Sequence, residues 1–204
     1  MPFLIFLVTM GCPMAMEIHD IYGDLPILET ERLILRKINL KDAKDMYAYC
    51  SNPEVAKYVT WHAHRSVTNT KEFIKYIMDQ YELKKVAPWG MEFKENGQLI
   101  GTIDFVWWQP KNRAAEIGYA LHPDYWGKGI MAEACRKLVS FGFTQMELIR
   151  IQARCVKANL ASERVMQKAG MKYEGTIRKG ILLKGKHQDM QLYSILREEY
   201  STLP

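Results

Sequence analysis

A glutamate and a glycine-rich loop stand close together in this chain. The segment from Glu116 to Ala132 reads EIGYALHPDYWGKGIMA, which predicts a strand, a loop with two glycines and the start of a long helix. The first N–H groups of a helix have no internal partner, and the helix dipole adds positive potential there. Because Gly127 and Gly129 lack a Cβ, the backbone can approach a bulky anion closely. The segment therefore predicts a phosphate-binding loop, with a simple tight turn as the alternative.

The same glycines also fit the dinucleotide-binding pattern GxGxxA, which would end at Ala132. That pattern starts directly after a strand, whereas the residues from His122 to Trp126 separate the predicted strand from the first glycine. The next predicted strand, LIRIQARCV (148–156), ends without the acidic residue that would bind a ribose. The context therefore argues against a nicotinamide nucleotide site.

Hydrophobic periodicity predicts the strands and helices that must position this segment. A strand over 29–37 precedes two helical stretches, one from Asp42 to Cys50 and one over 68–83. The other predicted elements are strands over 88–94, 99–108, 114–121 and 148–156, a helix through Ile130 and Phe141, a helix from Asn159 to Ala169, and a hairpin formed by 173–184 and 188–196. This order predicts a mixed α/β layer protein and not a regular βαβ repeat.

The composition is that of an ordinary folded protein. The 204 residues are 48% hydrophobic and 25% charged, which excludes disordered, collagen-like and coiled-coil chains. A net charge of +5 suits an anionic small ligand as well as a nucleic acid, but no compact Lys/Arg run or aromatic-basic RNA motif is present, so no direct nucleic-acid partner is expected. The four cysteines lack CxxC spacing, and His62 and His64 alone are a weak metal pair. These features predict free thiols, no metal and a cytoplasmic location.

An apolar segment opens the chain, and we expect residues 1–26 to be an extension and 27–204 to be a single domain. The run from Phe3 to Val8 is far shorter than the roughly 20 apolar residues of a membrane-spanning helix. No Lys or Arg precedes Arg32, so a signal peptide is not predicted either, and no membrane partner is expected. The extension either precedes the true start of the domain or is an arm that packs on a second subunit, so a homodimer stays open.

Several segments in the same order make the chain resemble the GCN5-related N-acetyltransferase (GNAT) superfamily. They are LETERLILRKINLKDA (28–43), EIGYALHPDYWGKGIMAEA (116–134), NLASERVMQKAGMKYEGTIRK (159–179) and the closing hairpin KGKHQDMQLYSILREEY (184–200). Within the superfamily the chain is similar to the branch that includes the ribosomal-protein N-terminal acetyltransferases. The resemblance implies the GNAT-like acyl-CoA N-acyltransferase fold, an α/β class in which helices flank a twisted, mixed and mostly antiparallel sheet.

The resemblance also implies acetyl-CoA as the cosubstrate, with its pyrophosphate on the backbone amides of the glycine loop. In family members this loop has the pattern Q/R-x-x-G-x-G/A, from which Trp126 and Met131 depart. The backbone amides remain usable if the Met131 side chain points into the core. The preceding strand would pair with the pantetheine arm, and Asn159 would bind the arm besides capping its helix. The implied cofactor-binding residues are Ala120, Leu121, His122, Trp126, Gly127, Lys128, Gly129, Ile130, Met131 and Asn159.

An amine would attack the thioester directly in such an enzyme, with Glu116 as the candidate general base. The alternative for Glu116 is a surface glutamate on an exposed strand. At pH 7, deprotonation costs about 4.6 kcal/mol for a lysine of pKa ~10.4 but only about 1–1.4 kcal/mol for an α-amine of pKa ~7.7–8.0. Many family members place a tyrosine where this chain has Met166, which cannot donate a proton. The resemblance therefore implies Ser162 as the general acid toward the thiolate.

The sequence leaves the acceptor open. The predicted activity is acetyl transfer from acetyl-CoA to a primary amine, and the resemblance favours the N-terminal amine of a ribosomal or other protein. A small-molecule acceptor such as an amino acid, a polyamine or an antibiotic is the alternative. A CoA-binding module without transferase activity is a second alternative, suggested by Met166. Trp107, Trp108, Trp61 and Tyr58 are candidates for an acceptor pocket, although core packing explains each of them as well.

Overall fold

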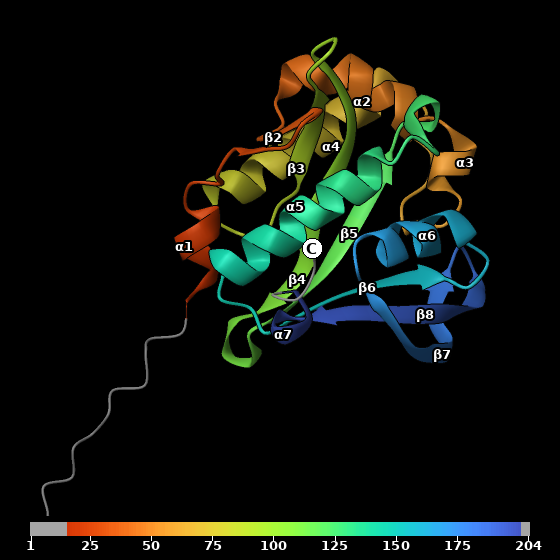
Figure 1. Ribbon diagram of the computed structural model, residues 1–204. Coiled ribbons are helices and arrows are strands. Elements are labelled where there is room, and N and C mark those ends of the chain that lie inside the picture. Colours follow the sequence, from red (N-terminus) through yellow and green to blue (C-terminus); the bar gives the residue numbers. More distant parts are fainter. Residues whose placement is uncertain (1–15, 201–204) are drawn as a thin grey trace, which may run out of the picture.

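The computed structural model describes residues 16–200, so the predicted apolar run at residues 3–8 lies outside the described residues. One eight-stranded sheet has the order β1-β2-β3-β4-β5-β6-β8-β7 (Figure 1). Only β5 and β6 are parallel neighbours, and every other adjacent pair is antiparallel. The strands are β1 (Leu28–Glu29), β2 (Leu33–Arg36), β3 (Trp89–Phe93), β4 (Gln98–Gln109), β5 (Ala114–Leu121), β6 (Arg150–Val156), β7 (Lys172–Leu183) and β8 (Lys186–Leu196).

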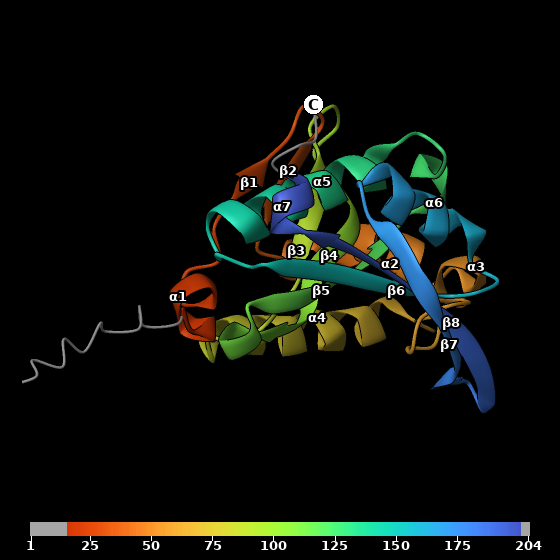
Figure 2. The same ribbon diagram turned by 60° about the horizontal axis from the view of Figure 1, so that its bottom comes forward.

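Helices cover both faces of the sheet, as predicted for a mixed α/β protein. Figure 2 shows α5 and α6 on one face and α4 on the other. The α-helices are α1 (Ile18–Tyr22), α2 (Ala43–Cys50), α3 (Pro53–Ala56), α4 (Val67–Glu82), α5 (Ile130–Thr144), α6 (Leu160–Lys168) and α7 (Arg197–Tyr200). Short 3₁₀ helices cover Leu40–Asp42, Pro110–Asn112 and Pro123–Tyr125. None of the helices within residues 16–200 is long and apolar enough to cross a bilayer.

The side-chain alternation of the central strands assigns residues to these two faces. Phe105 and Ile151 approach Gly142 of α5, so they and the buried residues that alternate with them face α5 and α6. Glu116 and its parallel partner Gln152 point to the opposite face, which α2 and α4 cover. The face toward α5 and α6 therefore carries apolar side chains at these positions, whereas the other face carries Glu116 and Gln152. A ligand that reaches both faces must pass between two strands.

The last residues of the predicted extension pack with the domain. Tyr22 of α1 is 1% exposed and contacts the rings of Trp89 and Trp108 at centroid distances of 5.9 and 6.5 Å. Leu25 is buried in the same core. The segment just before residue 27 is thus part of the folded unit.

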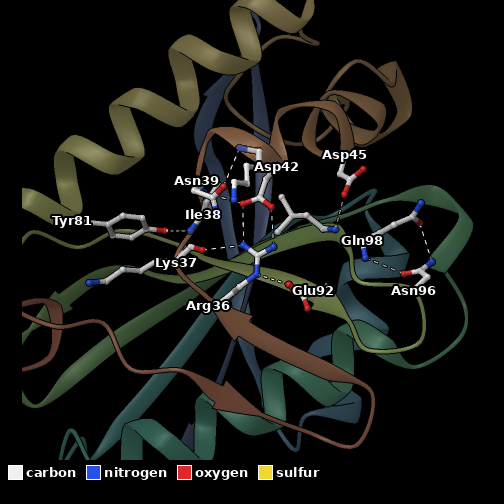
Figure 3. A network of polar contacts seen from close by, with 12 residues as sticks. Arg36, Lys37, Ile38, Asn39, Asp42, Asp45, Tyr81, Glu92, Asn96 and Gln98 are labelled. Atoms are coloured by element: carbon white, nitrogen blue, oxygen red, sulfur yellow. Dashed lines mark hydrogen bonds and ion pairs between the residues drawn. The ribbon is translucent and has the colours of Figure 1, made fainter.

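An arginine on β2 connects the sheet to the helices on the face that α2 and α4 cover (Figure 3). Arg36 donates two hydrogen bonds to Asp42, at 2.8 and 2.9 Å, and a third to Glu92 on β3. The hydroxyl of Tyr81, near the end of α4, accepts from the N–H of Ile38 at 3.1 Å. Because a bidentate arginine–carboxylate pair fixes both distance and orientation, this network holds α2 and α4 against the sheet.

Asp104 on β4 faces the same side, and its carboxyl group forms no hydrogen bond with the other residues described. Burial raises the pKa of Asp104 to about 7. Tyr22 and Tyr81, from α1 and α4, are the titratable groups whose pKa values respond to its charge. In the unfolded chain an aspartate titrates near pH 3.9. The native state therefore binds this proton more tightly, so the contribution of Asp104 to stability is present below pH 4 and is lost as the pH rises through about 7.

We expect Asp104→Asn to be more stable than the wild type at pH 8 and to lose that advantage near pH 4. The side chain is partly exposed, so the difference at pH 8 should be about 1–3 kcal/mol, below the value of about 4 kcal/mol that the full pKa change would give. Urea unfolding at pH 4, 6 and 8 measures it, with the exposed Asp79→Asn as the control. An Asp104→Asn variant that is less stable than the wild type at pH 8 would contradict this account.

Candidate functional site

The site begins where β5 and β6 part. The two strands pair only over Ala114–Glu116, opposite Arg150–Gln152 on β6. Beyond Glu116, β5 continues beside β4 while β6 continues beside β8. Backbone groups of 117–121 that point toward β6 therefore have no ladder partner there. A parted strand pair leaves open backbone groups that an amide-bearing ligand can satisfy.

A cavity of about 690 Å³ occupies this opening and reaches both faces of the sheet. On the α5 and α6 face it is lined by Tyr119, the glycine loop and the first turn of α6. On the other face it is lined by Glu116, Arg154 and the residues of α3 and the turn that follows. Figure 1 shows the beginning of α5 at the same end of the molecule as α6 and α3. The cavity thus connects an anion-binding loop on one face with a carboxylate on the other.

The glycine loop has the backbone conformation that an anion cradle requires. Gly127 and Gly129 have φ of +74° and +76°, in the left-handed region that favours glycine. No hydrogen bond of the described residues uses the backbone N–H groups of 127–132. Met131 departs from the family pattern, but its side chain is 4% exposed and lies in the core, so the condition for usable amides is met. These N–H groups begin the 15-residue helix α5, whose dipole favours an anion at this position.

A partly buried ion pair holds the loop in place. Glu133, in the first turn of α5, accepts hydrogen bonds from the hydroxyl of Thr30 at 2.6 Å and from the Nε of Arg32 at 2.7 Å. Arg32 also donates to the carbonyl oxygen of Lys128 at 3.0 Å. Burial alone would raise the pKa of Glu133, but the hydrogen bonds from Thr30 and Arg32 outweigh it and lower the pKa. This contact joins segments about 100 residues apart, so local sequence patterns gave no sign of it.

Most of the predicted site residues line this one cavity. They are Glu116, Ala120, Leu121, Trp126, Gly127, Gly129, Ile130, Met131, Asn159 and Ser162. His122 and Lys128 instead line a neighbouring cavity of about 620 Å³ between the β3–β4 turn and the glycine loop. The N–H of His122 is already bonded to the carbonyl of Ile100 at 2.7 Å, and its ring accepts from the N–H of Asp124. The side chain of His122 therefore serves the local turn.

Glu116 is a buried carboxylate and not an exposed surface glutamate. It is 5% exposed and accepts three hydrogen bonds. Oε1 accepts from the Nε of Arg154 at 2.9 Å, and Oε2 accepts from Trp107 Nε1 at 3.0 Å and Gln152 Nε2 at 2.8 Å. Trp107 is thus a partner of Glu116, while Trp108 is 6% exposed and packs in the core. The carboxylate is held rigidly at the point where the strands separate.

Ser162 has a partner that sequence reasoning missed. Its Oγ lies 2.8 Å from the hydroxyl oxygen of Tyr119, which also donates to the carbonyl oxygen of Ser162 at 3.1 Å. Burial raises the pKa of Tyr119 well above its ordinary value, so the phenol keeps its proton at neutral pH. Tyr119 alternates with Gly118 and so faces α6, a placement that strand alternation could have indicated. Asn159 caps α6 as predicted, accepting from the N–H of Ser162 at 3.2 Å.

A wall of the cavity comes from the short helix α3, which was not predicted. Asn52 caps this helix and Pro53 occupies its first turn, a combination typical of helix starts. Val55, Tyr58 and Thr60, from α3 and the following turn, line the same cavity as Glu116. Tyr58 packs against the small cluster of Val156, Leu183 and Met190. Of the four aromatic candidates for an acceptor pocket, Tyr58 is the one that lines this cavity.

Comparisons with known proteins agree with this geometry. The Acetyltransferase (GNAT) domain family matches residues 32–172. The uncharacterized N-acetyltransferase YoaA of Bacillus subtilis is 38% identical over 84% of this chain and 97% of its own length. The ribosomal-protein-serine acetyltransferase of Escherichia coli is 35% identical over 51% of this chain and 58% of its own length. A crystal structure of a GNAT-family acetyltransferase from Bacillus anthracis has a TM-score of 0.76 and 31% identity, covering 85% of this chain and 99% of that one.

The predicted superfamily, its fold and the resemblance to the ribosomal branch are therefore confirmed. Enzymes of this family use acetyl-CoA, which suits a cavity with free backbone N–H groups at one end and a parted strand pair beside them. Across residues 16–200, no group of three His, Cys, Asp or Glu side chains is placed to hold a metal ion. The chain belongs to the GNAT acetyltransferase family and is an N-acetyltransferase.

Proposed function

We propose that this enzyme acetylates the α-amine of a peptide or protein N-terminus. The observation that carries the proposal is the continuous cavity from the glycine loop, through the gap between β5 and β6, to Glu116. An α-amine needs little help to lose its proton at pH 7, and a carboxylate already engaged in three hydrogen bonds is suited to that modest task. The similarity to a ribosomal-protein-serine acetyltransferase supports the same class of acceptor.

The residues on the α5 and α6 face would bind acetyl-CoA. The N–H groups of 127–131 would hold the pyrophosphate, and Arg164 and Lys168 on α6 add positive charge to the same face of the cavity. Open backbone groups near Ala120 and Leu121 would pair with the pantetheine amides. Asn159 has its Nδ2 left to donate after its Oδ1 has capped α6. The thioester would then lie beside the gap, within reach of both faces.

Two groups would move protons during transfer. Glu116 would accept a proton from the attacking amine, directly or through water. Backbone N–H groups near Ala120 would stabilise the oxyanion. The hydroxyl pair of Ser162 and Tyr119 would donate a proton to the departing thiolate, replacing the tyrosine that is absent at Met166. Met166 is 1% exposed, so it belongs to the core and not to the reaction.

An acceptor screen tests the proposed function. The purified enzyme is incubated with acetyl-CoA and one amine at a time, and free thiol is measured as it forms. The panel contains peptides with free N-termini, the same peptides blocked at the N-terminus, free amino acids, polyamines and aminoglycosides. Mass spectrometry locates the acetyl group. Acetylation of unblocked peptides at the α-amine is expected; turnover confined to polyamines or aminoglycosides would contradict the proposal.

We expect Ser162→Ala and Tyr119→Phe to slow the reaction and not to abolish it. A thiol has a pKa of about 8.5, so the CoA thiolate leaves readily without an acid. The two hydroxyls share one hydrogen-bonded unit, so each single variant should lower kcat by about 2- to 10-fold and the double variant by little more than the worse single one. Steady-state kcat at pH 6–9 measures this. A loss of more than about 1,000-fold in either single variant would assign the residue a different role.

A further inference from the structure

Arg154 stands beside Glu116 with much of its hydrogen-bonding capacity unused. Its Nε donates to Glu116 Oε1 at 2.9 Å, and its side chain is 35% exposed within the cavity. No acceptor among the described residues bonds to its Nη1 or Nη2 atoms. Arginine carries five N–H donors in a fixed plane, so one hydrogen bond leaves a large surplus.

A second arginine on the same strand, Arg150, has a guanidinium whose donors are bonded to other side chains of the protein. Arg150 lies on the same face of β6, and its Nη1 and Nη2 bond to Glu174 at 2.6 and 2.7 Å. The same guanidinium also donates to Gln152 and Ser194. The contrast indicates that the free edge of Arg154 is available to a ligand, whereas Arg150 is a purely structural group.

We propose that Arg154 binds the carbonyl or carboxylate oxygen of a group bonded to the amine-bearing carbon of the acceptor, so that the site selects α-amino acyl compounds. This inference rests on the proposed function and states which chemical feature of the acceptor the site recognises. Glu116 Oε1 accepts only one hydrogen bond, while Oε2 accepts two. A hydrogen-bond acceptor and a set of free donors therefore lie side by side. An amine whose carbon also bears a carbonyl or carboxylate group presents the complementary pair, an N–H group and an oxygen two bonds beyond that carbon.

The rest of this face supports the same class of acceptor. Val55, Tyr58 and Val106 add apolar walls to the cavity that Arg154 and Glu116 line. A polyamine or an aminoglycoside would place a second cation near the Arg154 guanidinium, which repels it. A peptide N-terminus or an amino acid amide brings one cation and one oxygen, and the apolar walls accept its first side chain. Peptides and free amino acids both carry this combination of one amine and one nearby oxygen, so both belong to the selected class.

A matched pair of acceptors isolates the contribution of the oxygen. Alaninamide and 2-aminobutane have similar size, but only the first has a carbonyl group on its amine-bearing carbon. Because their amines differ in pKa, kcat/KM is expressed per neutral amine from measurements at pH 7–9. The wild type should favour alaninamide by about 10- to 100-fold, the range of a hydrogen bond to a charged group. Alanine and the dipeptide Ala-Ala, tested alongside, separate a free carboxylate from a peptide carbonyl as the source of the oxygen.

The variant Arg154→Gln should remove that preference to within about 3-fold, and Arg154→Lys should keep part of it. The loss should fall mainly on the KM of alaninamide, with the KM of acetyl-CoA nearly unchanged. The melting temperature should fall, because the buried Glu116 carboxylate loses its ion-pair partner, so the kinetics are measured at temperatures where thermal melts show the variant to be folded. The control is Arg178→Gln, which replaces an exposed arginine on β7 outside the cavity.

Three results would overturn the inference. They are equal use of the two amines by the wild type, equal loss of both in Arg154→Gln, and a preference for spermidine. Equal loss of both amines in Arg154→Gln leaves the proposed acetylation of α-amines intact, whereas a preference for spermidine would contradict that proposed acceptor as well. A wild type that turns over no amine at all would instead contradict the proposed function, and the inference with it.

Discussion

Glu116→Gln is expected to lower kcat/KM by about 100-fold at pH 7 when the acceptor is a peptide α-amine. The amide cannot take a proton from the attacking nitrogen. Glutamine keeps the volume of the side chain but offers one acceptor oxygen where glutamate offers two, and the native carboxylate accepts hydrogen bonds at both oxygens. One donor therefore loses its partner, which costs about 1–3 kcal/mol of stability. A thermal melt must accompany the kinetics.

The size of this loss should depend on pH in a way that identifies the acceptor. An α-amine with a pKa of ~7.7–8.0 is mostly neutral at pH 9, so the variant should recover to within about 10-fold of the wild type there. A lysine side chain with a pKa of ~10.4 stays protonated at pH 9, and the loss should persist. The control is Glu147→Gln, which changes an exposed glutamate that pairs with Arg113 and does not line the cavity. A Glu116→Gln variant with wild-type kcat/KM from pH 6 to 9 would remove Glu116 from the mechanism.

Local patterns predicted the strands and helices because each element carries a strong local signal. Residues 114–121 were expected as a strand and form β5 with the same bounds. The helix expected over 68–83 forms α4, where Ile74, Ile77 and Tyr81 lie buried at helical spacing. Only the strand expected over 29–37 is interrupted, because the chain turns between β1 and β2 and the Thr30 hydroxyl there bonds to Glu133.

The candidate site was less predictable because its contacts join distant segments. The glycine loop has a local signature, but its support by Arg32 comes from the turn between β1 and β2, 96 residues before Lys128. The partners of Glu116 come from β4 and β6, and neither Trp107 nor Arg154 is marked by any motif. Tyr119 was not predicted because the tyrosine of related enzymes corresponds to Met166 on α6, whereas Tyr119 lies on β5. Side-chain pairs across a fold are set by tertiary packing, which periodicity does not encode.

Two glycines with the same backbone conformation allow the phosphate loop to be tested without confusing binding with folding. Gly127 has φ +74° and Gly185, in the β7–β8 turn, has φ +79°. A Cβ added at either position meets no atom within 4 Å. Valine should therefore impose a similar strain of roughly 1–2 kcal/mol or more at both sites, because L residues are disfavoured in the left-handed region. The two variants differ in one respect: Gly127 lines the cavity and Gly185 does not.

Gly127→Val should bind coenzyme A about 100-fold or more weakly than the wild type, whereas Gly185→Val should bind it normally. The valine side chain would occupy the space in front of the free N–H groups, and losing two hydrogen bonds to a charged pyrophosphate costs about 3–6 kcal/mol. Titration calorimetry with coenzyme A measures the affinity, and thermal melts should show similar destabilisation of both variants. Since strain is matched, any difference in affinity comes from the position of the side chain relative to the ligand. Equal, near wild-type affinities in the two variants would mean that the pyrophosphate is bound elsewhere, and the assignment of the two faces of the cavity would then have to be reversed or abandoned.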